Sequence, residues 1–403
     1  MGRVCVIRHW YYPQDPRVHR EVEALLRDGH DVDVICAGGP SEPRRERGRV
    51  SVWRIPIGHR RRGLAHYAAQ YAAFLIAATA LAGMLAIRRR YDVVQVNSLP
   101  DWLVFAAIVP RMLGARVLLD LHECMPEYYM TKYRLAARHL LIRALSALEQ
   151  ASIAFADFAI TCTEQMRERF IERGADPRKV GVVLNACDED RFDARGYPGP
   201  SADGTFTLVC HGTIEENYGT DLPIRAVALL KDDLPSLRLR VYGDGTDRAR
   251  CIDLARELGV ADRVWFSDGF VPFEELMRCI AAADAGVVAI RRDRFRDLTH
   301  CNKMYDLVAL RRPAIISRTR AVEAYFGEGS FELFESDDVP DLARAIRAVA
   351  TDPELRARLV ARATAVGEPY RWMHQRERYL GYVRSLLPAP PTRVAVGVAA
   401  EKP

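Results

Sequence analysis

The chain has 403 residues, of which 49% are hydrophobic, so it is too long for one ordinary core and two domains are expected. Its 58 Lys and Arg residues nearly balance 53 Asp and Glu residues, and a net charge of +5 argues against a nucleic-acid-binding protein. Nine scattered cysteines without a Cys-x-x-Cys pair argue against a disulfide framework or a zinc knuckle. Together with a start that lacks the features of a secretory signal, they predict a reducing, cytoplasmic location.

Short apolar runs alternate with helical patterns through the first half of the chain. A strand is predicted at residues 4–7, followed by a helix at 17–28 that Gly29 terminates with a left-handed cap. Further strands are expected at 32–36, 93–96, 116–119, 158–162 and 180–184. This alternation predicts a parallel sheet covered by helices on both faces, and therefore an α/β, Rossmann-like doubly wound domain over residues 1–195.

The pattern starts again after residues 196–201 (GYPGPS), which are rich in turn formers. Strands are expected at 206–210, 237–242, 264–266, 286–290 and 314–317. They predict a second Rossmann-like domain over residues 196–368. A last helix over 369–387 is expected to pack back across the junction, and residues 388–403, rich in Pro, Ala and Val, are expected to form a disordered tail.

Residues 64–87 contain no Asp, Glu, Lys or Arg and lie between the arginine triplets 60–62 and 88–90. The segment is long enough to span a membrane, but it is rich in alanine and lies between two strands of one predicted sheet, which favours a crossover helix. Its large side chains recur at helical spacing and predict core packing; they are Tyr67, Tyr71, Phe74, Leu81 and Leu85. The alternative is peripheral contact of residues 60–90 with an anionic membrane surface, at the inner face of the membrane.

Polar residues that follow strands are the candidates for a ligand site, because open parallel sheets bind ligands at the carboxyl ends of their strands. His122, together with Asp120 and Glu123, follows the strand at 116–119. These groups could hydrogen-bond a sugar or provide acid–base chemistry. The alternative is an ordinary loop histidine beside an aspartate that caps a turn.

A second candidate is the start of a predicted helix at Asn302. Free amides and the helix dipole at such a start suit a diphosphate, and Lys303 adds a positive charge. Asp306 lies three residues later on the same face and could accept hydrogen bonds from both hydroxyls of a ribose. The alternative is an exposed Lys–Asp pair.

Two glycine turns are weaker candidates. Gly212, followed by Thr213, comes after the strand at 206–210 and permits close approach of the backbone to a phosphate. Gly243 follows the strand at 237–242 in an ordinary Asp-Gly turn. A Gly-x-Gly-x-x-Gly motif is absent after the first strand, which argues against a dinucleotide-dependent dehydrogenase.

In their order and spacing, these segments resemble the family 4 retaining glycosyltransferases, also called glycosyl transferases group 1. The family has the GT-B fold, in which two Rossmann-like domains face each other across an interdomain cleft. The resemblance covers residues 3–385. It rests on residues 13–18 (PQDPRV), 29–32 (GHDV), 91–94 (YDVV), 120–123 (DLHE), Asn185 with Asp188, 211–219, 242–245 (YGDG), 302–306 (NKMYD) and 312–314 (RPA).

The resemblance implies a retaining glycosyltransferase that moves a sugar from a nucleotide-diphosphate sugar to a saccharide, lipid-linked or small-molecule acceptor. It implies that the first domain binds the acceptor and the second binds the nucleotide sugar, without a metal or other cofactor. His122 matches the family's histidine near the donor sugar, and Asp306 stands where the family has a glutamate that holds the ribose. His122, Asp306 and Lys303 are therefore the expected catalytic residues.

The remaining donor contacts also follow from the resemblance. Asn302, with Lys303, is placed near the diphosphate, and Gly212 and Thr213 line it from the other side. Val271 is placed where the backbone reads the nucleotide base. Gly243 is expected to complete the donor site.

The sequence departs from the family at three places, one of which is the absence of the N-terminal glycine pair that often faces the donor. The family has two glutamates separated by seven residues, whereas Leu298 stands at the first position here. Thr213 and Tyr218 replace the arginine and lysine that usually grip the diphosphate, so positive charge is expected from Lys303, Arg291 and Arg292. These departures keep two alternatives open: a nucleotide-sugar epimerase of the same fold, or a degenerate, non-catalytic binding protein.

Overall fold

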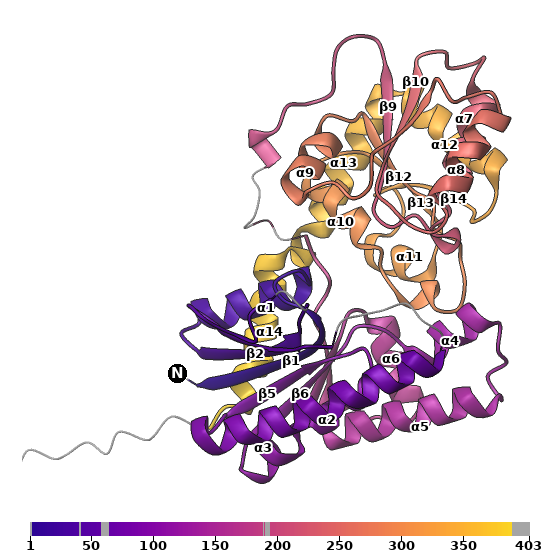
Figure 1. Cartoon of the computed structure of the whole chain (residues 1–403). Coiled ribbons are helices and arrows are strands. Elements are labelled where there is room, and N and C mark those ends of the chain that lie inside the picture. Colours follow the sequence, from indigo (N-terminus) through magenta and orange to yellow (C-terminus); the bar gives the residue numbers. More distant parts are fainter. Residues whose placement is uncertain (1, 40–41, 58–63, 188, 190–193, 389–403) are drawn as a thin grey trace, which may run out of the picture.

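The computed structural model describes residues 2–39, 42–57, 64–187, 189 and 194–388. Two α/β domains lie one above the other in Figure 1. Each is built on a parallel sheet, with one antiparallel edge pair in the first, so the predicted pair of Rossmann-like domains is confirmed. Asp188, the arginine triplet at 60–62 and residues 389–403 of the predicted tail lie outside the described residues.

The first domain has an eight-stranded sheet with the order β3-β4-β2-β1-β5-β6-β7-β8. Its strands are β1 (Arg3–Tyr11), β2 (Asp31–Ala37), β3 (Arg45–Arg47), β4 (Ser51–Ile55), β5 (Val93–Asn97), β6 (Arg116–Leu121), β7 (Phe158–Thr161) and β8 (Val180–Val182). The central strands are buried on both faces, as apolar runs in a parallel sheet require. The sequence pattern does not predict the edge strand β3 or its neighbour β4, because neither has a continuous apolar run.

Helices cover both faces of this sheet (Figure 1). They are α1 (Pro16–Arg27), α2 (Leu64–Arg89), α3 (Ile108–Met112), α4 (Met125–Tyr133), α5 (Leu140–Phe155) and α6 (Glu164–Glu172), with the 3-10 turns η1 (Asp101–Ala107) and η2 (Pro177–Lys179). α1 begins where predicted because Asp15 caps it and Pro16 fits its first position. It ends before Gly29, whose φ of 86° is the expected left-handed geometry.

The second domain has a six-stranded, fully parallel sheet with the order β11-β10-β9-β12-β13-β14. Its strands are β9 (Phe206–His211), β10 (Leu237–Tyr242), β11 (Val264–Phe266), β12 (Ala285–Val288), β13 (Ala314–Ser317) and β14 (Glu332–Phe334). Its helices are α7 (Asp221–Leu230), α8 (Arg248–Glu257), α9 (Phe273–Ala281), α10 (Asn302–Ala309), α11 (Arg320–Phe326), α12 (Val339–Thr351) and α13 (Pro353–Gly367). Short 3-10 turns are η3 (Ala194–Gly196), η4 (Glu216–Tyr218), η5 (Arg296–Leu298) and η6 (Glu368–Tyr370).

The last helix, α14 (Trp372–Leu386), leaves the second domain and packs beside α1 of the first (Figure 1). It places Trp372, Tyr379 and Val383 in the same buried cluster as Val18 of α1. The Tyr379 hydroxyl donates a hydrogen bond of 2.6 Å to Gln95 Oε1 on β5. The core of the first domain therefore includes α14, which begins nearly 200 residues after the last strand of that domain's sheet. The exact domain boundary between residues 195 and 196 stays a prediction.

Direct contacts join the two domains at the carboxyl edge of the first sheet. The Thr163 hydroxyl, just after β7, donates to the carbonyl oxygen of Leu298 in η5. The backbone N–H of Glu164 donates to the Tyr325 hydroxyl at 2.7 Å. These contacts place η5 and α11 of the second domain against the start of α6.

Helix α2 has one face in the core of the first domain. Phe74 and Leu85 of the predicted stripe are buried, and Tyr71 and Leu81 are half-buried. The side chain of Tyr67 lies outside the described residues. The prediction of core packing is therefore correct for this face of α2. Within Ala69–Arg89, which is long and apolar enough to cross a membrane, only 33% of the most apolar window is buried, so much of the helix faces outward.

Replacing Tyr379 by Phe should lower the free energy of unfolding by about 1–2 kcal/mol, because Gln95 Oε1 loses its buried hydrogen-bond donor. Tyr133→Phe is the matched control, since 46% of Tyr133 is exposed. Urea denaturation of both variants measures the difference. Equal stabilities for the two variants would show that the bond between α14 and β5 contributes nothing.

Candidate active site

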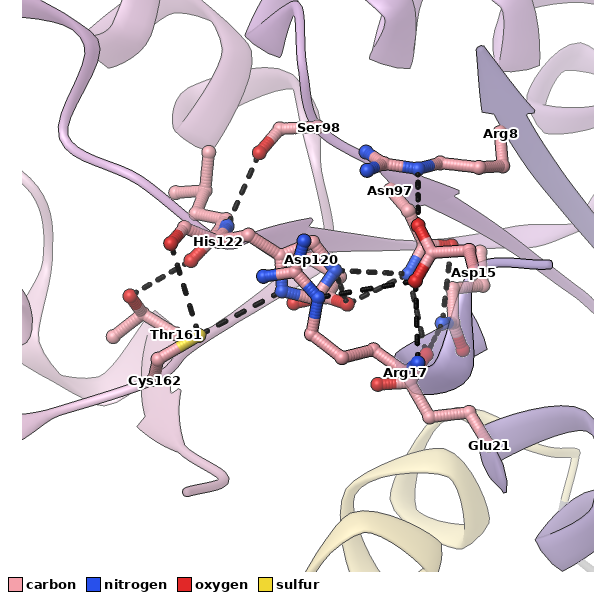
Figure 2. Close-up of polar contacts among 12 residues, drawn as sticks. Arg8, Asp15, Arg17, Glu21, Asn97, Ser98, Asp120, His122, Thr161 and Cys162 are labelled. Carbon is pink, nitrogen blue, oxygen red and sulfur yellow. Dashed lines mark hydrogen bonds and ion pairs between the residues drawn. The ribbon is translucent and has the colours of Figure 1, made fainter. Parts of the chain in front are cut away.

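Polar side chains gather where strands of the first sheet end (Figure 2). Arg8 on β1, Asn97 on β5 and Asp120 on β6 are register partners across three neighbouring strands, and His122 follows β6 directly. The carboxyl ends of parallel strands lie at one edge, where such sheets bind ligands. The predicted histidine thus belongs to a cluster of buried polar residues.

His122 contacts protein groups with both ring nitrogens. Nε2 lies 2.7 Å from Asp120 Oδ2, and Nδ1 lies 3.6 Å from Cys162 Sγ. The backbone N–H of His122 donates to Ser98 Oγ at 3.1 Å (Figure 2). A neutral imidazole satisfies both ring contacts, with Nε2–H donating to the carboxylate and Nδ1 accepting from the thiol. These contacts hold the ring in place.

Burial controls the protonation of this cluster. It lowers the pKa of His122 well below its ordinary value, and the charges of Arg17 and Arg8 lower it further. Burial raises the pKa of Asp120 to about 7 and that of Glu21 to about 8. Glu21 receives hydrogen bonds from Asn97 and Gln95, which only partly offset the cost of burying its charge. Near neutral pH the imidazole is uncharged while Glu21 holds a proton.

Two arginines give the cluster positive charge. Arg8 Nε donates to Asp15 Oδ2 at 3.0 Å, and Arg17 Nε lies 3.9 Å from the other oxygen of Asp15. Burial would raise the pKa of Asp15, but the two arginines outweigh it and hold that pKa at about 2. Arg8 Nη1 is buried and has no hydrogen-bond partner among the described residues. One carboxylate thus faces two guanidinium groups, and this part of the site favours an anion.

In the second domain, glycines bring the predicted donor-binding segments together. Gly212 (φ 100°) and Gly243 (φ 155°) both adopt backbone angles that side chains disfavour. A Cβ on Gly243 would lie 1.8 Å from Gly212 O, and a Cβ on Gly212 would lie 2.6 Å from Lys303 Cε. The loops after β9 and β10 therefore touch each other and the first turn of α10.

Asp306 lies on α10, one turn after Lys303. Its Oδ2 is 3.1 Å from His211 Nε2, and Cys187 Sγ donates to its Oδ1 at 3.3 Å. The Asp306 side chain keeps 20% of its surface exposed. The carboxylate is thus oriented at the end of β9 and retains an open edge for further hydrogen bonds.

Tyr218, which stands where the family has a lysine, lies between two cations. Lys303 Nζ lies 4.6 Å from the centre of its ring, and the Arg296 guanidinium carbon also lies 4.6 Å from it. Arg296 Nε is buried without a hydrogen-bond partner in the part of the chain that is described. The sequence did not single out Arg296, because one arginine in the charged segment 291–297 has no distinguishing pattern.

The two arginines predicted to supply charge are already paired. Arg291 forms a double hydrogen bond with Asp221 at 2.9 and 3.0 Å and a further ion pair with Asp337. Arg292 Nε donates to both oxygens of Asp297 at 2.9 and 3.1 Å. Their carboxylate partners balance their charge, so Arg291 and Arg292 are poor candidates for a diphosphate.

The segment after β8 connects the two halves of the site. Asn185 Nδ2 donates to Cys162 Sγ at 3.2 Å, and that thiol contacts His122. Two residues later, Cys187 donates to Asp306. His122 and Asp306, from different domains, are thus linked through two thiols and one short stretch of chain.

The other predicted donor residues lie around this centre. Thr213 is half-exposed beside Gly212, and Asn302 is the exposed first residue of α10. Val271 lies between β11 and α9 and packs on the buried cluster that includes Tyr242. Their roles stay predictions.

Comparison with known families decides the assignment. Residues 14–186 match the family described as glycosyl transferase 4-like domain, and residues 198–366 match glycosyl transferases group 1. The chain belongs to the group 1 glycosyltransferases. The resemblance seen in the sequence is therefore confirmed over most of both domains.

The glycosyltransferase is 30% identical over 258 residues to D-inositol 3-phosphate glycosyltransferase of Stackebrandtia nassauensis, covering 58% of this chain and 55% of the relative. It is 27% identical over 218 residues to glycogen synthase of Mycobacterium tuberculosis, covering 53% and 50%. The chain thus spans about half the length of the curated relatives it matches.

Solved structures confirm the GT-B fold over nearly the whole chain. Sucrose-phosphate synthase of Thermosynechococcus elongatus superposes with a TM-score of 0.72 at 18% identity, covering 96% of this chain and 99% of that one. HepE of Anabaena in complex with UDP gives a TM-score of 0.70 at 14% identity, covering 96% and 100%. At these identities the likeness concerns the fold.

Glu21→Gln should make the glycosyltransferase's stability less sensitive to pH. Native Glu21 keeps its proton up to a pKa of about 8, whereas an unfolded glutamate releases it near its ordinary value. The native state therefore binds more protons between these values, and the free energy of unfolding falls as pH rises between them. We expect the variant to remove roughly 1–3 kcal/mol of this fall between about pH 5 and 8.

Urea denaturation at several pH values measures this slope. Glu354→Gln is the control, because 90% of the Glu354 side chain is exposed. An unchanged slope in Glu21→Gln would contradict the assignment of a buried, protonated carboxyl group at this position.

Proposed function

We propose that this glycosyltransferase moves a sugar from a nucleotide-diphosphate sugar to a saccharide, lipid-linked or small-molecule acceptor, with retention of configuration. The observation that carries the proposal is the pairing of Asp306 and Lys303 on the first turns of α10, beside Gly212 and linked through Cys187 to the His122 cluster. In this proposal Asp306 would hold the ribose, the start of α10 would bind the diphosphate, and His122 would face the donor sugar.

Each group has a role that its surroundings support. Asp306, oriented by His211, would accept hydrogen bonds from the ribose hydroxyls through its exposed edge. The free amides at Asn302 and the backbone at Gly212, Thr213 and Gly243 would line the diphosphate. Val271 would read the base through its backbone, as the family resemblance implies. HepE, which shares the fold, was solved with UDP, which supports a nucleoside diphosphate here as well.

His122 would position the donor sugar. Its neutral ring cannot serve as an acid near pH 7, because burial keeps the pKa of the imidazole low. In a retaining transfer the acceptor hydroxyl attacks from the face that the diphosphate leaves, and the departing phosphate oxygen takes its proton. The bond from the anomeric carbon to the phosphate oxygen breaks, the bond to the acceptor oxygen forms, and negative charge accumulates on the diphosphate. Stabilising that charge is therefore the main task of the protein.

Lys303 and Arg296 would supply this stabilisation. A cation above an aromatic ring is held in place without being neutralised, so both charges beside Tyr218 remain available to a phosphate. Arg291 and Arg292 differ because carboxylates balance them. Within the described ranges, no group of three His, Cys, Asp or Glu side chains could hold a metal ion. The prediction of metal-independent transfer relies on the positive charges of Lys303 and Arg296.

A cytoplasmic location is part of the proposal. All nine cysteines are free thiols, and seven of them are buried. Cys162 and Cys187 contact His122 and Asp306 as thiols, so a reducing compartment preserves the site.

The test of the activity is transfer and hydrolysis with a panel of nucleotide sugars. His122→Ala and Asp306→Ala should each reduce kcat/KM by about 100-fold or more, with Asp306→Ala mainly weakening donor binding. Full activity in both variants would contradict the site. Conversion of a nucleotide sugar without any acceptor would favour the epimerase, and calorimetry without nucleotide binding would favour a non-catalytic protein.

Arg296→Gln should lower kcat by about 100-fold while changing the KM of the donor less, since the charge matters most as the diphosphate departs. Arg296→Lys should recover part of the rate because it retains a cation above Tyr218. Arg256→Gln on the exposed side of α8 is the control for net charge. If Arg296→Gln and Arg256→Gln behaved alike in steady-state kinetics, Arg296 would have no part in the reaction.

A further inference from the structure

The outer face of α2 is apolar along its described length. From Ala69 to Ile87 every exposed side chain of the helix is Ala, Ile or Met. Ile76 is 71% exposed and Ile87 is 69% exposed, with Met84 between them at 39%. The opposite face of α2 packs in the core of the first domain. Folding therefore requires the inner face to be apolar, but it does not require the outer face to be so.

Helix α3 extends the same surface. Gly83 of α2 packs on Val109 of α3, since a Cβ on Gly83 would lie 3.1 Å from Val109 Cγ1. The two helices form a groove of about 550 Å³ lined almost entirely by apolar atoms. Beside it, Met112 is 81% exposed. We call this surface, made by the outer faces of α2 and α3, the apolar face. Contiguous apolar surface of this kind marks an interaction site.

The charges around the apolar face have one sign. The sequence contains no Asp or Glu from residue 47 to 91 or from 102 to 119. Arg88 and Arg90 are exposed at the end of α2, and Arg111 stands on α3. Of the two carboxylates between these stretches, Asp101 is buried and Asp92 accepts a hydrogen bond from the backbone of Arg3. The apolar face therefore borders arginines, and these stretches of the sequence contain no exposed, unpaired carboxylate.

We propose that the apolar face docks on an anionic lipid bilayer. Exposed isoleucine and methionine side chains would enter the boundary between headgroups and acyl chains, and Arg88 and Arg90 would reach the lipid phosphates. The helix lies flat on the surface, because Phe74 and Leu85 on its inner face are part of the first domain's core and cannot leave it. A protein partner could also cover an apolar surface, but the arginines that border this face, with no exposed, unpaired acid among them in these stretches, favour an anionic lipid surface.

The docking surface lies on the domain that carries His122. This narrows the acceptor to a lipid-linked saccharide or lipid headgroup, a step that rests on the proposed function. The docking itself is independent of sugar transfer and has its own measurement.

The experiment is sedimentation of the full chain with vesicles. We expect binding to phosphatidylglycerol mixed with phosphatidylcholine at low salt, weaker binding at high salt, and little binding to phosphatidylcholine alone. The double substitution Arg88→Gln with Arg90→Gln should weaken binding about 30-fold, since each arginine near an anionic surface contributes about 1 kcal/mol. Ile76→Ser with Ile87→Ser should weaken it by about tenfold or more.

Two control variants carry matched changes elsewhere. Leu229→Ser removes an exposed apolar side chain of α7 in the second domain, and Arg256→Gln removes one exposed charge of α8. Both should bind vesicles like the unmodified chain. A thermal shift with UDP confirms that each variant is folded and separates a failure of docking from a failure of the donor site.

Four results would overturn the docking proposal. Absence of vesicle binding, or equal loss in the control variants, would show that the apolar face does not recognise lipid. A dimer that dissociates in Ile76→Ser with Ile87→Ser, without vesicle binding, would identify a second copy of the chain as the occupant. Binding that resists high salt and alkaline extraction would show insertion across the bilayer.

Discussion

The buried carboxyl group of Asp120 is the constraint on which the first half of the site depends. Only 3% of this residue is exposed, so its oxygens must be satisfied by protein groups. Asn97 Nδ2 donates to it at 2.6 Å, and His122 Nε2 lies at 2.7 Å. That arrangement holds the imidazole of His122 in place. Asn97 and Gln95 both donate hydrogen bonds to Glu21, and Gln95 accepts one from Tyr379 of α14. The C-terminal helix and His122 therefore belong to one buried hydrogen-bond network.

The second half of the site is organised by backbone contact instead. Gly243 lies against Gly212, and Gly212 lies against the stem of Lys303, so the donor loops can only take this arrangement with glycine at both positions. The family's usual lysine is replaced by Tyr218, yet the site keeps two cations because an aromatic ring can hold Lys303 and Arg296 on its faces. Two cations therefore lie beside Tyr218, at one of the positions where the sequence departs from the family pattern.

Helix α2 shows how one segment can serve two surroundings. Phe74 and the buried alanines Ala78, Ala82 and Ala86 pack in the core of the first domain, whereas Ile76 and Ile87 on the outer face are 71% and 69% exposed. Both faces of α2 are apolar, so hydropathy alone cannot tell the buried face from the exposed one. The packing of its inner face in the core of the first domain argues against a membrane span, and the proposed docking concerns the outer face alone.

Local patterns were sufficient for the pair of parallel α/β domains, most strand positions and the family, because apolar periodicity and turn residues are short-range signals. They also selected His122, Lys303 and Asp306 as candidate site residues, whose roles stay predictions. They missed the edge strands β3 and β14 and the strand β4, whose short sequences lack a periodic apolar pattern. They favoured Arg291 over Arg296, because whether a charge is paired depends on residues far apart in sequence, such as Asp221 at 70 positions' distance. Packing between distant segments decided which cations remain available and which face of α2 stays exposed.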